Sequence, residues 1–138
     1  CLEAFASHDI PFDPELDYEN VRFSYEGGYS AVRSLLEQGR SFTALYAAAD
    51  VIAIGAIRAL WDHGLRVPDD VSVIGVDGLA IGDYSVPRLS TVRQSVAELA
   101  CRSIQILQEQ MESNAPARHE TILPSVDWKD STAGKIDN

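Results

Sequence analysis

Two short apolar runs, separated by a helix-like segment, constrain the fold of this chain more than any other feature. The runs are SFTALYAAA, beginning at Ser41, and VSVIGV, beginning at Val71. Each is too short for a typical helix and is apolar on both faces, which is typical of a buried strand. The segment between them, VIAIGAIRALWDHG, is apolar on most sides and ends at Gly64, as a buried helix would. This order of strand, helix and strand predicts a parallel βαβ unit.

The flanking segments continue the alternation of strands and helices. An extended run at residues 20–24, which we predict to be the first strand, precedes a helical pattern of apolar residues that closes at Gly39. After the second strand come a short strand, LSTVRQ, a long amphipathic helix opening at Ser95, and a last strand, TILPSVDW. We therefore predict an α/β fold with a parallel sheet and helices on both faces.

Charge and composition exclude several classes of function. The net charge of −10 repels phosphate backbones, so we do not expect the chain itself to bind DNA. No apolar run approaches the roughly 18 residues of a membrane span, so no membrane partner is expected. Cys1 and Cys101 are far apart and form neither a disulfide framework nor a zinc motif, which favours a reducing cytoplasm.

The two ends of the chain lead to two further expectations. CLEAF is typical of the end of an amphipathic helix, without the cap or strand that normally begins a domain, so we expect a fragment. Residues 133–138 are small and polar and are expected to be disordered.

Candidate binding residues follow from the strand ends, because ligands of open α/β sheets bind beyond the carboxyl ends of the strands. This singles out Tyr46, Ala49, Asp50 and Asp77. Asp50 also precedes a helix, and capping is the favoured interpretation. For Asp77, a turn-forming role and a hydrogen bond to a ligand remain equally open. Phe23, near the end of the extended run, is either a core residue, which position alone favours, or a stacking platform.

No sequence motif nominates catalytic chemistry. The signatures of metalloproteases, esterases, dinucleotide-binding proteins and P-loop enzymes are all missing from the sequence. Missing motifs do not exclude an enzyme, but the only carboxylates at strand ends, Asp50 and Asp77, have no visible partner base. We therefore rank an enzyme last and expect no catalytic residue, no metal site and no cofactor.

Four blocks in a fixed order resemble the lactose and galactose repressor (LacI/GalR) family of bacterial transcription regulators. They are the D-x-x-A-x-G of DVIAIG, the block GLRVPDDVSVIGVD, the P-x-L-S-T-V strand with its long helix, and LPSVDWKDST. In the last block Lys129 stands where the family usually has Arg. The resemblance covers nearly all of residues 1–132.

The resemblance implies a periplasmic-binding-protein-like effector domain of two α/β subdomains joined by crossovers. Residues 1–132 would be its C-terminal part, with crossover elements of the other subdomain. The helix-turn-helix domain and the N-terminal subdomain would lie outside this chain, so DNA would be bound only through them. The alternative is a periplasmic sugar-binding transport receptor of the same fold.

The resemblance also assigns roles to single residues. Asp77 matches an effector-bonding Asp, Phe23 a stacking aromatic, and Tyr46 a strand-end aromatic of purine-binding members. Ala49 replaces the Asn of several sugar-binding members, and Val96 lines the pocket. The implied effector is sugar-like or purine-like. The segments that match the subunit interface of a homodimer contain Val51, Ile54, Ile81, Tyr84 and Val86.

Overall fold

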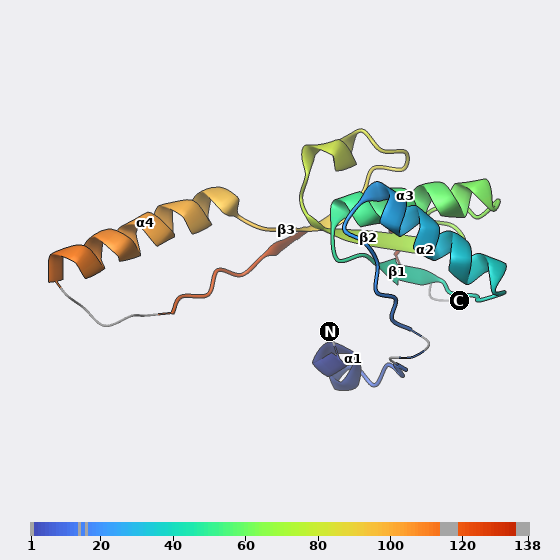
Figure 1. Ribbon diagram of the computed structural model, residues 1–138, viewed down its shortest axis with the longest axis horizontal. Coiled ribbons are helices and arrows are strands. Elements are labelled where there is room, and N and C mark those ends of the chain that lie inside the picture. Colours follow the sequence, from blue (N-terminus) through green and yellow to red (C-terminus); the bar gives the residue numbers. More distant parts are fainter. Residues whose placement is uncertain (1, 14, 16, 114–118, 135–138) are drawn as a thin grey trace.

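The computed structural model describes residues 2–13, 15, 17–113 and 119–134 (Figure 1). In chain order the elements are α1 (Leu2–Ser7), α2 (Tyr25–Glu37), β1 (Ala44–Tyr46), α3 (Asp50–Asp62), β2 (Ser72–Asp77), the 3₁₀ helix η1 (Ala80–Asp83), β3 (Ser90–Arg93), α4 (Val96–Ser113) and β4 (Ser125–Asp127). The predicted alternation from the first long helix onward is confirmed.

The extended run at residues 20–24 is not a strand, and in this respect the prediction was wrong. Ser24 is the N-cap of α2, and its Oγ accepts a hydrogen bond from the Gly27 backbone N–H at 3.0 Å. The run therefore leads into a helix instead of pairing with the sheet. Of the tail expected to be disordered, residues 135–138 lie outside the described residues.

The four strands form one sheet in the order β1-β2-β3-β4. β1 and β3 both run parallel to β2, and Val92 of β3 lies opposite Val76. β4 runs antiparallel to β3, with Val126 opposite Val92. The sheet is therefore mixed, and the prediction of a parallel sheet fails for its last strand. The chain leaves the sheet after β3, follows α4 outward and returns beside β3 in the opposite direction (Figure 1).

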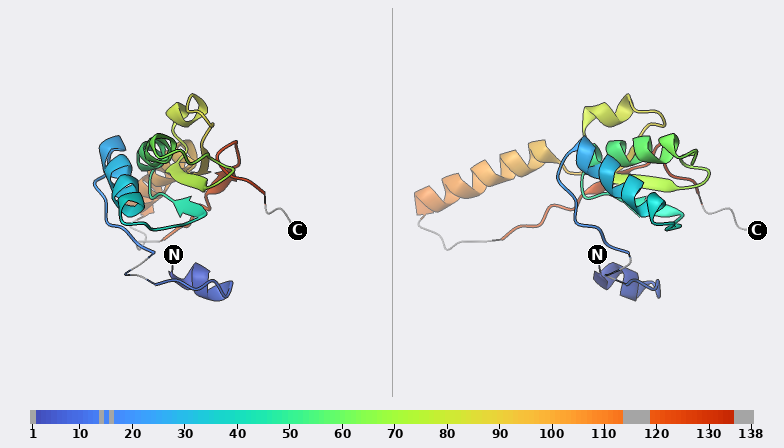
Figure 2. Two further views of the ribbon diagram at one scale, coloured as in Figure 1. Left: turned by 90° about the vertical axis from the view of Figure 1, so that its right-hand side faces the viewer. Right: turned by 45° about the vertical axis from the view of Figure 1, so that its right-hand side comes forward.

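Helices α2 and α3 lie on one face of the sheet. Among the described helices, only α3 makes extensive contact with a strand, and α2 packs on α3 (Figure 2). In β2, buried Val73 and Gly75 alternate with Ile74 and Val76, which are only half-buried. We expected helices on both faces, but within the described residues they are not found there, because α2 packs on α3 and not on the opposite face of the sheet.

Two glycines bring α2 and α3 into backbone contact. A Cβ atom on Gly28 would lie 2.1 Å from the Ile52 carbonyl oxygen, and one on Gly55 would lie 2.0 Å from that of Tyr25. No side chain fits at either position. This contact fixes the start of α2 beside the first turns of α3.

The buried core lies around α3 and the strands that it covers. Its members are Val32, Ala47, Ala49, Ile52, Ala53, Ala56, Ile57, Ala59, Leu60, Val71, Val73 and Leu89. By contrast, α4 extends away from the sheet (Figure 1) and, within the described residues, leaves its apolar stripe exposed. The exposed members of this stripe are Val96, Leu99, Ile104, Leu107 and Met111.

Replacing Gly28 by alanine should destabilise the fold by about 1–2 kcal/mol. Overpacking typically costs about 1–3 kcal/mol, and the gain of about 1 kcal/mol in helix propensity offsets only part of that cost. The midpoint of urea unfolding measures the effect. Gly134→Ala is the control, because no atom lies within 4 Å of a Cβ added there. Equal midpoints for the two variants would refute the close helix contact.

Candidate effector site at the carboxyl edge of the sheet

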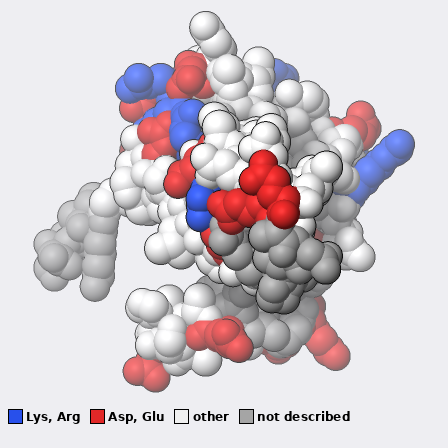
Figure 3. Space-filling model, turned by 90° about the vertical axis from the view of Figure 1, so that its left-hand side faces the viewer, with Lys and Arg blue, Asp and Glu red and all other residues white. Residues whose placement is uncertain are grey.

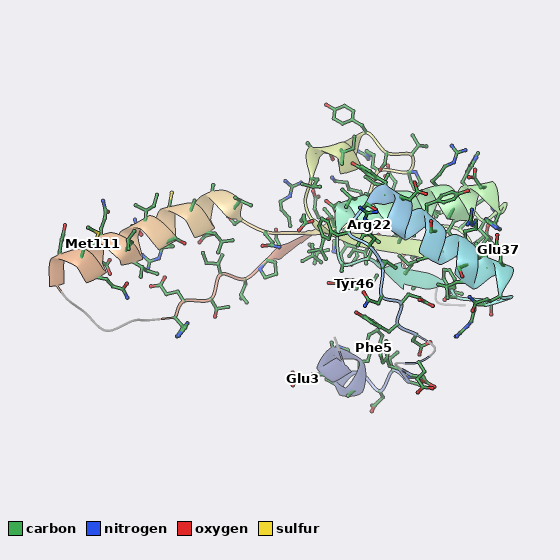
Figure 4. All side chains as sticks on the ribbon, in the orientation of Figure 1. Glu3, Phe5, Arg22, Glu37, Tyr46 and Met111 are labelled. Carbon is green, nitrogen blue, oxygen red and sulfur yellow. The ribbon has the colours of Figure 1, made fainter. Side chains whose placement is uncertain are left out.

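The carboxyl ends of β1, β2 and β3 lie at one end of the sheet, because the three strands are parallel. Tyr46 ends β1, Asp77 ends β2 and Arg93 ends β3. We call this end the carboxyl edge. Figure 4 shows Tyr46 and Arg22, the neighbour of Phe23, at the same end of the sheet, from which α4 departs. Two of the predicted site residues, Tyr46 and Asp77, therefore share one end of the sheet.

The two predicted aromatic residues are both exposed. Phe23 is 70% exposed and Tyr46 is 56% exposed. Phe23 is therefore not a core residue, although position alone favoured the core. Exposed aromatic faces can stack on the apolar face of a sugar ring or on a purine.

Asp77 has an unusual backbone conformation and an unpaired carboxylate. Its φ is +111°, a value that a residue with a side chain rarely adopts and that is typical of strained functional positions. The side chain is half-buried, and no described residue forms a hydrogen bond or an ion pair with it. Burial, and after it the negative charge of Asp50, raise the pKa of the Asp77 carboxyl. A carboxylate held in this way is available to accept hydrogen bonds from a ligand.

Asp50 is not the cap of α3, and this prediction was wrong. The N-cap is Ala49, which makes no side-chain capping bond. The fully buried Asp50 carboxylate instead accepts one hydrogen bond from the Thr91 hydroxyl and one from the Leu79 backbone N–H, both at 2.6 Å. Sequence reasoning missed this arrangement because both donors are distant in the sequence.

The other two predicted site residues differ in exposure. Ala49 is fully buried at the start of α3, whereas Val96 is largely exposed at the start of α4. A hollow of about 260 Å³ opens where the sheet meets the start of α4, and Val96 is not among its lining residues. It is lined by Val76, Val92, Gln94, Ser95, Leu99, Ile122 and Pro124.

A group of ion pairs, which the sequence analysis also did not predict, links β3, β4 and η1. Arg93 pairs with Asp127 at 2.7 Å, and Lys129 lies 3.4 Å from the same carboxylate. Lys129 also pairs with Asp83 of η1, and this hydrogen bond is the main cause that raises the pKa of the ammonium group. Lys129, at the position where the family usually has Arg, thus also carries a positive charge, and its ion pairs link η1 to β4.

The predicted interface residues lie on the outer side of α3 and on the η1 loop. Val51 and Ile54 are half-buried, Ile81 is exposed, and Tyr84 and Val86 are 83% and 90% exposed. A hollow of about 330 Å³ here is lined by Ile54, Ile57, Arg58, Trp61, Ser85 and Val86. Trp61, which sequence analysis did not select, belongs to this surface. Ile54, Trp61, Ile81, Tyr84 and Val86 are called the apolar patch below.

Within the described part of the chain, no three His, Cys, Asp or Glu side chains are grouped so that they could hold a metal ion. No helix there is both long enough and apolar enough to cross a membrane.

Comparison with known proteins identifies the family. A model described as a periplasmic binding protein-like domain matches residues 2–132, which is nearly the whole chain. The chain belongs to this family, and its relatives are LacI-family transcriptional regulators, as the sequence blocks indicated.

Three relatives illustrate the similarity. The HTH-type transcriptional regulator AscG of Escherichia coli (strain K12) is 43% identical over 97 residues, which are 70% of this chain and 29% of AscG. The lac repressor dimer bound to operator and an anti-inducer has a TM-score of 0.89 at 25% identity, over 96% of this chain and 46% of that one. A LacI family regulator from Enterococcus faecium with bound ribose has a TM-score of 0.80 at 29% identity, over 96% and 49%. The chain thus spans less than half the length of each of these relatives.

Replacing Asp77 by asparagine should raise the melting temperature at pH 7. Because the folded state raises the pKa of this carboxyl, the folded protein binds a proton more tightly than the unfolded chain does. The free energy of unfolding therefore falls as the pH rises through the raised pKa, and the uncharged variant escapes this loss. Calorimetry between pH 3 and pH 7 should show a gap between variant and wild type that narrows toward pH 3. A gap that does not depend on pH would contradict this account.

Proposed function

We propose that this chain is the small-molecule-sensing and dimerisation part of a LacI-type transcriptional repressor. It binds a sugar-like or purine-like effector at the carboxyl edge, and a helix-turn-helix segment outside the chain contacts operator DNA. The protein acts in the cytoplasm and is not an enzyme. The regulators among the relatives support this function over a transport receptor.

The observation that carries the proposal is the Asp77 carboxylate, which has no hydrogen-bond or ion-pair partner among the described residues, at the same end of the sheet as the exposed ring of Tyr46. A carboxylate accepts hydrogen bonds from two hydroxyl groups of a sugar or from ring N–H groups of a purine, and Tyr46 and Phe23 offer stacking faces. Ala49 supplies no polar group, so recognition of the effector depends more heavily on Asp77. The ribose bound to the Enterococcus faecium relative shows that one protein of this fold takes a ligand of this class.

The charge distribution supports DNA contact through another segment. The net charge is −10, and the face in Figure 3 carries basic side chains interspersed with acidic ones, without a continuous basic surface among its described residues. Attraction to a phosphate backbone requires such a surface. In the lac repressor relative, the protein bound to operator is a dimer.

Effector binding can be tested by thermal shift with a panel of pentoses, hexoses, their phosphates and purine bases. At least one compound should raise the melting temperature of the wild type. For that compound, Asp77→Asn should weaken binding about ten- to a hundredfold in calorimetric titration, since hydrogen bonds to charged groups contribute about 1.5–3 kcal/mol. Asp69→Asn, a change at an exposed side chain in an ion pair with Arg66, is the control and should bind normally. An unchanged dissociation constant for Asp77→Asn, or a panel without any hit, would refute the site.

Dimerisation is expected through the apolar patch, because a group of exposed Trp, Tyr, Val and Ile side chains is unfavourable in water. Trp61→Lys should convert the dimer to a monomer in sedimentation velocity experiments. Trp128→Lys is the matched control, since Trp61 is 71% and Trp128 is 68% exposed and Trp128 lies outside the patch. Equal sedimentation of the two variants would show that the patch is not the interface.

A further inference from the structure

The buried Asp50 carboxylate joins three segments that meet behind Asp77. It belongs to the first turn of α3, and its two hydrogen-bond donors come from β3 and from the loop after β2. Each oxygen has its own donor, Thr91 Oγ1 for Oδ1 and the Leu79 backbone N–H for Oδ2. Neither donor belongs to α3, so the carboxylate contributes nothing to the capping of its own helix.

The Thr91 hydroxyl extends the same network by one residue. While it donates to Asp50, its oxygen accepts a hydrogen bond from the Gly78 backbone N–H at 3.2 Å. Asp50 and Thr91 together therefore hold the N–H groups of residues 78 and 79, the two residues that directly follow Asp77. Both side chains are buried, Asp50 fully and Thr91 to 98% (2% exposed), so water does not compete for these bonds.

The neighbouring backbone leaves room for this arrangement. A Cβ atom on Gly75 would lie 2.3 Å from Asp50 Oδ1, so only glycine accommodates the carboxylate there. Gly78 has a φ of +75° and directly follows the +111° of Asp77. Two consecutive residues with positive φ need an external restraint, because Asp77 pays a conformational cost in this region.

We propose that Asp50 and Thr91 are a positioning pair that holds the backbone of residues 77–79 in its positive-φ turn and so directs the Asp77 carboxylate toward the effector. Only the nature of the ligand of Asp77 rests on the proposed function, since the backbone restraint can be measured without a ligand. A purely structural pair would stabilise the whole fold without a particular effect on residues 77–79.

The test compares Thr91→Val with Thr91→Ser in the complete natural protein. Valine keeps the shape of threonine and loses the hydroxyl, whereas serine keeps the hydroxyl. Hydrogen–deuterium exchange of the ligand-free protein, read in a peptide covering residues 77–83, should accelerate by about tenfold or more in Thr91→Val. Exchange in a peptide from α3, covering residues 52–60, should accelerate much less than exchange in residues 77–83. Thr91→Ser should match the wild type in both peptides.

Two further variants complete the design. Asp50→Asn keeps the size of the side chain but can accept from only one of the two donors, and it replaces Thr91→Val if that variant does not fold. Ser90→Ala removes a neighbouring buried hydroxyl, which accepts a hydrogen bond from the backbone N–H of Lys129 at 2.8 Å, away from residues 78 and 79. It should lower the melting temperature without accelerating exchange in residues 77–83.

Binding of D-ribose, or of the panel compound that stabilises the wild type, gives the second measurement. Thr91→Val should bind it about tenfold more weakly at a temperature where the variant is fully folded, and Thr91→Ser should bind normally. Exchange that accelerates equally in both peptides, or unchanged exchange in residues 77–83, would overturn the positioning role. If no compound binds the wild type while exchange responds as expected, the proposed function fails and the backbone restraint stands.

Discussion

The rest of the structure depends on the buried carboxylate of Asp50. An unpaired charge in the core is strongly destabilising, so this side chain must keep both of its donors. To keep them, the first turn of α3, the loop before η1 and strand β3 have to meet at one point. Gly75 provides the space for that meeting. The strained backbone of Asp77 lies one residue from the bonds that this carboxylate organises.

The same elements serve both proposed surfaces. α3 carries Asp50 at its start and Trp61 of the apolar patch near its end, while the segment after β2 leads from Asp77 to Tyr84 within a few residues. An effector bound by Asp77, as proposed, would therefore act on a loop that also belongs to the proposed subunit contact. Such shared elements are the physical connection that a ligand-driven shift between two states requires. Lys129 adds a second tie, because it joins η1 to β4 through Asp83 and Asp127.

Local patterns predicted most of the elements, and the features that they missed are set by long-range pairing. The helical periodicity of α2 and α4 and the apolar run of β2 are properties of neighbouring residues, so the sequence indicated them correctly. The antiparallel direction of β4 depends on the route of the chain after α4. Asp50 looked like a cap because an acidic residue before a helix usually is one, yet its donors are 29 and 41 residues away. The strand-end rule pointed to Asp77 and Tyr46, whereas the exposure of Phe23 could not be read from its position.

The most direct test of the account is a crystal structure of the natural protein with the compound that stabilises it. We expect the ligand at the carboxyl edge, with Asp77 oxygens within about 3.2 Å of two ligand donors and with the ring of Phe23 or Tyr46 against the ligand. The turn at residues 77–79 should keep its positive φ values. A ligand bound at the apolar patch, or one that makes no contact with Asp77, would contradict the central claim.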